Sequence, residues 1–121
     1  MENKIRSFTD LQAWREGHFL VLRIYKATEV FPKMEMFGLT SQMRRAALSI
    51  TSNIAEGFSR KSSKEKSQFY SIALGSVCEL QNQLLVSRDV GYLPRDDFNT
   101  ISEKTILVSK LVRGLLKHFS V

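Results

Sequence analysis

The stretch QMRRAALSITSNIAEG, from Gln42 to Gly57, decides the fold because one helix can carry its whole pattern. At 100° per residue, four of its apolar side chains and a leucine three residues before it fall within an arc of about 80°, which is typical of a helix that packs one face on a core. These residues are Leu39, Met43, Ala46, Ile50 and Ile54. We expect Thr40 to cap the start of this helix and Gly57 to end it as a C′ residue.

A second stripe, which is polar, runs immediately beside the apolar one. It consists of Gln42, Arg45, Ser49, Asn53 and Glu56. A solvated helix face usually carries Lys and Glu, whereas most of these side chains are small or amides. One interpretation is a partly buried, hydrogen-bonded seam between helices or between subunits, in which each polar group needs a partner. The other interpretation is the ordinary boundary of an amphipathic helix.

Apolar periodicity predicts three further helices, and local signals mark their ends. The four predicted helices cover about residues 10–30, 40–56, 63–90 and 96–119. Ser62 and Glu65 form a capping-box pattern, and Gly91 is a stop signal. Asp96 or Asp97 is the expected cap of the last helix. Four helices with short connections and no strand pattern predict an all-α, antiparallel up-down-up-down four-helix bundle.

The same periodicity predicts which side chains face the core. In the first helix they are Leu11, Trp14, His18, Val21, Leu22 and Tyr25, and in the third Phe69, Ile72, Ala73, Ser76, Val77, Leu80 and Leu84. We expect His18 to be a hydrogen-bonded core histidine and Cys78 a small packed side chain. Gly75 lies in mid-helix, where it costs up to about 1 kcal/mol against alanine, so a close approach by a neighbouring helix is expected there.

The predicted bundle makes one specific contact testable. If the second and third helices fold back about a turn near residue 60, Arg45 lies level with Ser76, and Gln42 lies level with Glu79. We therefore expect an ion pair between Arg45 and Glu79. Such a buried pair matters more for register than for net stability.

Composition excludes several classes of protein. With 121 residues, 43% of them hydrophobic and 25% charged, the chain is expected to form one globular domain with one core. The longest uncharged run, 67–78, is well short of the ~18 residues that cross a bilayer, and the first residues lack a signal-peptide core. We therefore expect a cytoplasmic protein with no membrane partner.

The sequence lacks the residue patterns by which common catalytic and metal sites are recognised. A single cysteine and two distant histidines cannot build a Cys/His metal cluster. No Gly-rich phosphate loop, paired-carboxylate site or Ser/His/Asp constellation is present. We therefore expect no metal, no cofactor and no catalytic residue.

The net charge of +6 and the pI near 9.7 predict attraction to polyanions. The basic residues form two clusters, Arg60, Lys61, Lys64 and Lys66 in one turn, and Lys110, Arg113 and Lys117 within a narrow arc of the last helix. Neither cluster is interleaved with aromatic residues, so contacts with RNA or DNA would be to phosphate and weakly sequence-specific. A merely solvated basic face is the alternative for each cluster taken alone.

Two other functions compete with nucleic-acid binding. Arg113 and His118 have the R-x4-H spacing that resembles the nuclease motif of HEPN-type helical bundles. That fit is poor, because five residues place the two side chains ~140° apart on a helix. A protein-interaction module, such as an adaptor for a separately encoded enzyme, fits the surplus apolar surface of the first and third helices.

Several segments resemble the four-helix-bundle family encoded in intervening sequences of bacterial 23S ribosomal RNA. They are FTDLQAW at 8–14, FP followed by E at 31–35, FGLTSQMRRAALSITSNIAEG at 37–57, IALGSVCEL at 72–80 and DVGYL at 89–93. The resemblance spans about residues 8–119, and the segments are specific only in combination. Phe37-Gly38 departs mildly from the Tyr-Gly that is common in the family.

The resemblance implies a homo-oligomer, specifically a pentameric barrel of bundles. It also implies kinship with the accessory variability proteins of diversity-generating retroelements, which look like basic pentamers that bind nucleic acid and a reverse transcriptase. No catalytic residues are established in the family. Its motif falls here on Gln42, Arg45, Ser49, Asn53, Glu56, Gly57, Gly75, Ser76 and Glu79. We therefore predict a non-enzymatic homo-oligomer that binds RNA or DNA, with a protein adaptor as the alternative.

Overall fold

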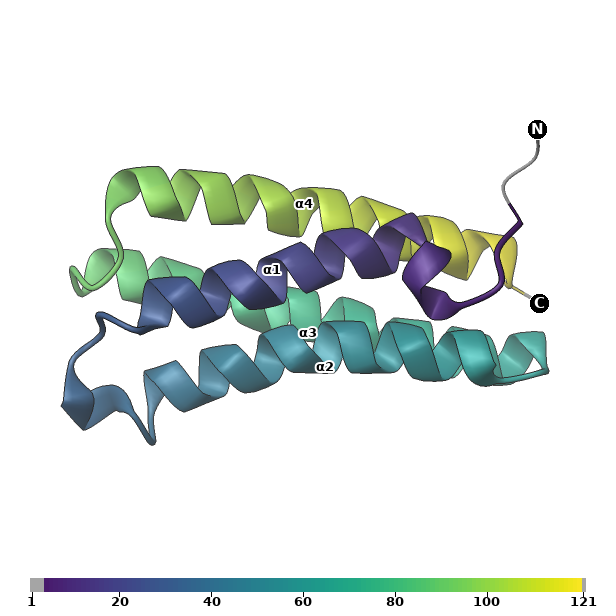
Figure 1. The fold of residues 1–121 in the computed structure, drawn as a ribbon, viewed down its shortest axis with the longest axis horizontal. Coiled ribbons are helices and arrows are strands. Elements are labelled where there is room, and N and C mark those ends of the chain that lie inside the picture. The colour runs from purple at the N-terminus through teal and green to yellow at the C-terminus, as the bar shows by residue number, and fades with distance from the viewer. Residues whose placement is uncertain (1–3, 121) are drawn as a thin grey trace.

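The computed structural model describes residues 4–120, which form long α-helices and two short 3-10 helices. The elements are η1 (Phe8–Asp10), α1 (Gln12–Thr28), η2 (Lys33–Glu35), α2 (Leu39–Ser59), α3 (Ser63–Asp89) and α4 (Arg95–His118). No strand occurs within residues 4–120, and the predicted all-α bundle of four helices is confirmed. The α1–α2 and α3–α4 connections lie at one end of the bundle, and the α2–α3 turn lies at the other (Figure 1).

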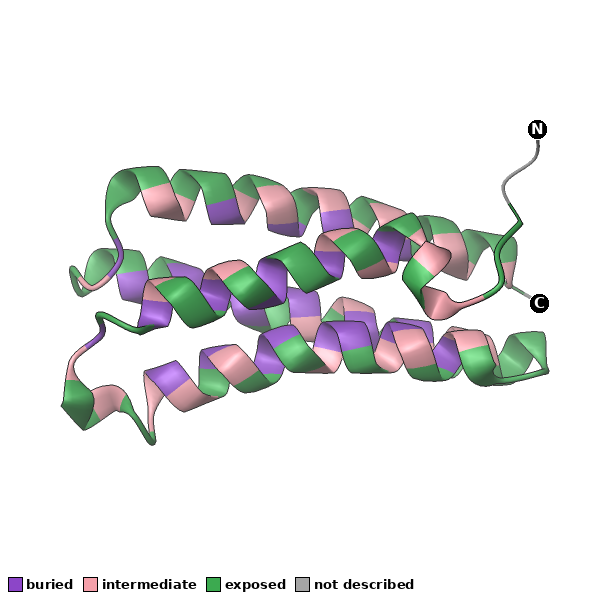
Figure 2. Ribbon diagram, in the orientation of Figure 1, coloured by how far each residue is buried: buried purple, intermediate pink, exposed green. Residues whose placement is uncertain are grey.

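The core lies between the four helices, each of which packs against two others. Helix α1 contacts α2 and α4, and α3 contacts the same two helices. Buried residues line the inward faces (Figure 2). From the predicted α2 stripe, Met43, Ala46, Ile50 and Ile54 are all buried. That part of the prediction is confirmed: the stripe packs against the other helices, which removes its apolar side chains from water.

The ends of α3 follow the local signals in the sequence. The Ser62 hydroxyl accepts a hydrogen bond from the Glu65 backbone N–H at 3.1 Å, which confirms the predicted cap. At the other end Gly91 adopts a φ of 87°, and the Tyr92 N–H donates to the Ser87 carbonyl at 2.9 Å. This is a Schellman motif, in which a left-handed residue after the helix allows orphan carbonyls to be satisfied.

Two predicted caps were wrong. Thr40 is buried inside the first turn of α2, and the carboxylate of Glu35 instead accepts a hydrogen bond from the Leu39 N–H at 3.2 Å. Helix α4 begins directly after Pro94, so Asp96 and Asp97 lie inside its first turn. There the carboxylates favour the positive end of the helix dipole without capping it.

The predicted core face of α1 was wrong by roughly 100° around the helix axis. Leu20 and Ile24, which are not among the predicted core residues, are fully buried. His18, Leu22 and Tyr25, which were expected inside, are exposed. The imidazole of His18 therefore is not a core group.

Small residues explain why α1 is turned this way. Ala13 and Gly17 are buried, and a Cβ atom on Gly17 would lie 3.1 Å from the Thr51 Cγ2 atom of α2. Packing on these small residues brings α1 and α2 close together and leaves the neighbouring rings of Trp14 and His18 at the flank of the contact. At one flank His18 stacks on the Trp14 indole, with the ring centroids 4.7 Å apart.

At the centre of the predicted core face of α3 the side chains are buried, but at its edges some are exposed. Ala73, Val77, Leu80 and Leu84 are buried as predicted, together with Tyr70. Ile72 and Cys78, in contrast, are exposed, so the cysteine is not the packed side chain that we expected. Periodicity alone does not distinguish a core stripe from an apolar stripe that a single chain leaves exposed.

Gly57 does not end α2, which continues to Ser59. It is buried against the ring of Tyr70, and a Cβ atom at Gly57 would lie 2.6 Å from the Tyr70 Cε1 atom. Tyr70 is 1% exposed, and burial raises the pKa of its hydroxyl above the ordinary value. A glycine is therefore required here by a close contact between α2 and α3.

We expect the substitution Gly57→Ala to lower the free energy of unfolding by about 1–3 kcal/mol, because the new methyl group must displace a packed aromatic ring. The control is Gly114→Ala, since a Cβ atom at the exposed Gly114 of α4 meets nothing within 4 Å. That change should raise the free energy of unfolding by about 0.5–1 kcal/mol. Urea denaturation followed by circular dichroism measures both; equal stabilities of Gly57→Ala and the wild type would contradict the contact.

Candidate nucleic-acid interface

The predicted polar seam lies between α2 and α3, and its centre is hydrogen-bonded. The hydroxyl oxygens of Ser49 and Ser76 are 2.7 Å apart. The Asn53 side-chain amide donates to the Ser49 carbonyl at 2.8 Å and to its hydroxyl at 3.1 Å. All three side chains are half-buried, so these small polar groups have the partners that partial burial demands.

Among the described residues, those at the ends of the predicted seam make no hydrogen bond or ion pair that connects α2 to α3. Ser49 lies opposite Ser76, where Arg45 was expected, so the register of α2 on α3 differs from our prediction by one helical turn. The reason is that α2 continues through Gly57. Gln42, Arg45 and Glu79 are exposed. The expected ion pair between Arg45 and Glu79 was wrong: salt bridges within residues 4–120 join other residues.

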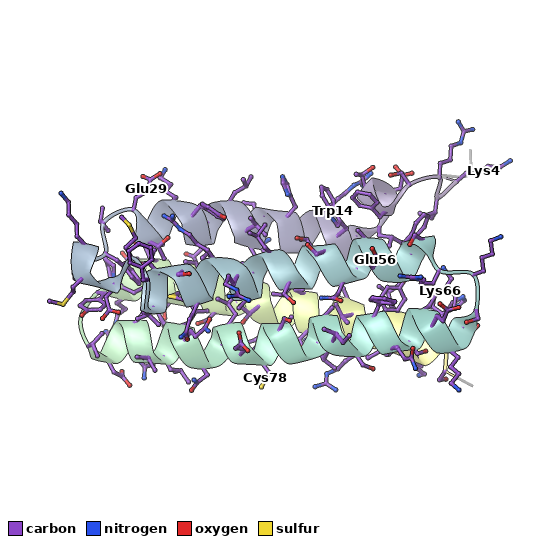
Figure 3. All side chains as sticks on the ribbon, turned by 90° about the horizontal axis from the view of Figure 1, so that it is seen from below. Lys4, Trp14, Glu29, Glu56, Lys66 and Cys78 are labelled. Carbon is purple, nitrogen blue, oxygen red and sulfur yellow. The ribbon has the colours of Figure 1, made fainter. Side chains whose placement is uncertain are left out.

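The first basic cluster and the C-terminal part of the second, Arg113 and Lys117, lie towards the same end of the bundle, whereas Lys110 lies nearer the middle of α4. The Ser67 hydroxyl, in the first turns of α3, donates to the Phe119 carbonyl just after α4 at 3.1 Å. The rings of Tyr70 and Phe119 lie 6.0 Å apart. Figure 1 shows the α2–α3 turn and the end of α4 together at this end of the bundle, and Figure 3 shows Lys66 there, opposite to Glu29.

Arg60 is not free to bind an anion. Its guanidinium lies 3.0 Å from the Glu56 carboxylate and 3.8 Å from that of Glu65, and it covers the Phe69 ring at 4.8 Å from the ring centroid. Two carboxylates therefore compensate its charge. Our prediction missed the pair with Glu56 because it ended the helix at Gly57, whereas α2 continues to Ser59 and gives the two residues i,i+4 spacing.

Lys66 is a structural residue. Its ammonium donates to the Phe58 carbonyl at 2.8 Å and to the Gly57 carbonyl at 3.2 Å, and it lies 5.5 Å from the centroid of the Phe119 ring. The last carbonyls of a helix lack partners within the helix and carry the negative end of its dipole. Lys66 therefore satisfies the end of α2 and joins it to α3 and α4.

The other predicted cations are exposed, and none of them forms an ion pair within the described part of the chain. We call this set the basic surface: Lys61, Lys64, Lys110, Arg113 and Lys117. Three of its members come from α4, where steps of three and four residues space them along about 10 Å of the helix. Such a row faces on the order of three successive phosphates of one strand.

Arg113 also borders a shallow groove between α3 and α4. Two further lining residues are apolar, Leu74 and Val77. The remaining lining residues are small or polar: Ser71, Gly75, Cys78, Gln81 and Ser109. Since no carboxylate lines this groove, nothing there opposes the approach of an anionic backbone. The groove was not predicted, because it depends on how α3 and α4 pack.

The residues of the nuclease-like motif are both exposed on α4. The His118 ring packs edge-on against Phe119, with the centroids 4.6 Å apart. Within residues 4–120, no three His, Cys, Asp or Glu side chains gather in a way that could hold a metal ion. No helix in this range is long and apolar enough to cross a membrane.

Comparisons with known proteins agree with the fold. A family model described as 23S rRNA-intervening sequence protein matches residues 9–114. The chain belongs to this family. A solved structure of a protein of unknown function from the S23 ribosomal protein family, from Bacteroides thetaiotaomicron, is similar, with a TM-score of 0.79 and 21% sequence identity. The match covers 87% of this chain and 95% of that one, and it shows a shared fold. None of the curated proteins matches this 23S rRNA-intervening sequence protein.

We expect Lys66→Met to lower the free energy of unfolding by about 1 kcal/mol, because it leaves the last carbonyls of α2 without their charged donor. The matched control is Lys64→Met, since Lys64 is exposed and outside these contacts. That control should change stability by less than about 0.5 kcal/mol. Thermal unfolding of the two variants distinguishes the two roles, and equal losses would show that Lys66 has no special part in the fold.

Proposed function

We propose that this 23S rRNA-intervening sequence protein is a non-enzymatic homo-oligomer that binds RNA or DNA through phosphate contacts. One observation carries the proposal: cations from the α2–α3 turn and from the C-terminal half of α4, far apart in the sequence, lie towards the same end of the bundle, and none of them forms an ion pair within residues 4–120. Unpaired cations that cluster on one surface are the electrostatic footprint of a polyanion site.

The side chains of the basic surface favour recognition of the backbone over recognition of bases. The aromatic rings at this end, Phe58, Phe69 and Phe119, are half-buried and lie against Arg60 or Lys66. They are therefore poorly placed to stack on bases. Binding through lysine and arginine alone releases counterions, depends steeply on salt and discriminates weakly between sequences.

The outward face of α3 supports assembly of an up-down-up-down bundle into an oligomer, for which we propose a pentamer. Between Lys66 and Arg88 the only charged residue of α3 is Glu79, and Ile72 is half exposed on this face. A Cβ atom on Gly75 would meet nothing within 4 Å, so no helix of the same chain makes the close approach that this glycine suggests. A second copy can make it. Each added copy multiplies the basic field and the avidity for a polymer.

A protein adaptor without nucleic-acid binding is the second candidate. Phe19, Leu22 and Tyr25 of α1 are exposed, so a separately encoded protein would find apolar surface there. This function uses α1 and leaves the basic surface as a determinant of solubility only. Nucleic-acid binding assays therefore separate the two candidates.

The direct test is a titration of a labelled RNA hairpin and a matched DNA duplex across a salt series. The test variant carries Lys61→Ala, Lys64→Ala, Arg113→Ala and Lys117→Ala. The control variant removes the same charge at the other end of the bundle, through Lys26→Ala, Arg45→Ala, Arg88→Ala and Arg95→Ala. We expect the test variant to bind at least tenfold more weakly, with a salt slope that falls by about one for each phosphate that is no longer neutralised. The control should stay close to wild type.

Other outcomes of this titration would overturn the proposal in distinguishable ways. Equal losses in both variants would show that net charge alone attracts the nucleic acid. No binding at low salt would favour the protein adaptor. Shortened RNA in the recovered samples, abolished by His118→Ala, would instead identify a ribonuclease.

The oligomer is tested separately by light scattering. We expect the wild-type mass to be a multiple of the 13.9 kDa of one chain, and Ile72→Glu to yield smaller species by placing a charge in the α3 face. Circular dichroism of the variant checks that the bundle remains folded. A wild-type protein that stays a monomer at micromolar concentration would contradict the proposed assembly.

A further inference from the structure

The end of the bundle opposite the basic surface exposes large apolar side chains. Four come from the α1–α2 connection, with exposed fractions of 78% for Val30, 83% for Met34, 55% for Met36 and 93% for Phe37. Val90, beside the α3–α4 connection, is 55% exposed. We call this set the apolar end. Exposed apolar residues are normal singly, but their concentration at one end indicates an interface.

The backbone beneath the apolar end is held in place by hydrogen bonds. One carboxylate oxygen of Glu35 accepts from the Leu39 N–H, and the other accepts from the Tyr92 hydroxyl at 3.1 Å. The second bond joins the two connections and raises the pKa of Tyr92. Phe31, which is buried, packs on the Tyr92 ring with the centroids 5.5 Å apart. A surface held in this way loses little conformational entropy on association.

The size of the apolar end suits a contact between two copies of this chain. Its five side chains offer on the order of 600 Å² per copy, and the residues around them bring the total near the ~800 Å² per partner of a standard interface. The rim carries both signs of charge, since Glu29 and Lys33 are exposed and neither forms an ion pair within residues 4–120. A mixed rim is self-complementary, whereas Glu29 would oppose an anionic membrane surface.

We propose that the apolar ends of two copies pack against each other about a two-fold axis, with Glu29 of each copy near Lys33 of the other. In such an isologous contact each surface is its own partner, and the contact closes. The pairing leaves the α3 face free for the proposed oligomer. It also places the two basic surfaces at opposite poles of the assembly. If the proposed function holds, the paired protein bridges two segments of nucleic acid.

The test compares masses by light scattering and sedimentation at several concentrations. The test variant is Met34→Ser with Phe37→Ser, and the control is Leu22→Ser with Ile106→Ser, which removes exposed apolar side chains of α1 and α4 away from the apolar end. We expect the wild type to be a pair of pentamers, the test variant to have half that mass, and the control to keep the wild-type mass. An unchanged mass of the test variant would overturn the pairing.

Charge reversal tests the orientation of the pair. Glu29→Lys alone and Lys33→Glu alone should each weaken pairing, because like charges then meet, and the double variant should recover it. Recovery requires that the two residues face each other across copies. Failure of the double variant to recover, with the fold intact by circular dichroism, would overturn the two-fold arrangement.

The failure of this inference and the failure of the proposed function are distinguishable. If Ile72→Glu leaves only species of twice the 13.9 kDa chain mass, the α3 face and the apolar end both associate as proposed. If the variant of the basic surface keeps its nucleic-acid binding while pairing is intact, the proposed function fails and the pairing stands. A Met34/Phe37 variant that keeps its mass but no longer pellets with phosphatidylserine vesicles would identify a membrane contact and overturn pairing.

Discussion

The contact of Gly57 with the Tyr70 ring fixes how α2 lies on α3, and the rest of the structure depends on it. Because the glycine lets α2 continue past the ring, the turn comes later and Ser49 meets Ser76. In the same register, the Lys66 ammonium donates to the last carbonyls of α2 and lies beside the Phe119 ring, which follows the end of α4. This contact holds the end of α4, with its exposed cations, next to the α2–α3 turn.

The two ends of the bundle differ chemically although the helices between them share one core. The basic surface lies at the end with the α2–α3 turn, and the apolar end is built from the other two connections. Charges attract a polyanion over a long range, whereas apolar side chains favour a shape-complementary contact. An elongated bundle keeps these two kinds of surface apart, which suits a protein that assembles at one end and binds at the other.

Sequence patterns predicted the features that depend on neighbouring residues within one helix, and they missed the features that depend on packing between helices. The α2 stripe and the Ser62 cap depend on neighbours within one helix, and both are observed. The face of α1 depends on how closely the small residues around Gly17 approach α2, which no periodicity contains. Likewise, Lys66 was predicted to be a free cation because its partners, the Gly57 and Phe58 carbonyls, come close to it only through the α2–α3 turn.

The central claim is that the basic surface is where nucleic acid lies. Acetylation of lysines by a soluble reagent, with and without saturating RNA at low salt, tests it most directly when each site is quantified by mass spectrometry. We expect RNA to protect Lys61, Lys64, Lys110 and Lys117 severalfold, to leave Lys26 and Lys33 unchanged, and Lys66 to react slowly in both states. Uniform protection of all lysines, or protection confined to Lys26 and Lys33, would contradict the claim.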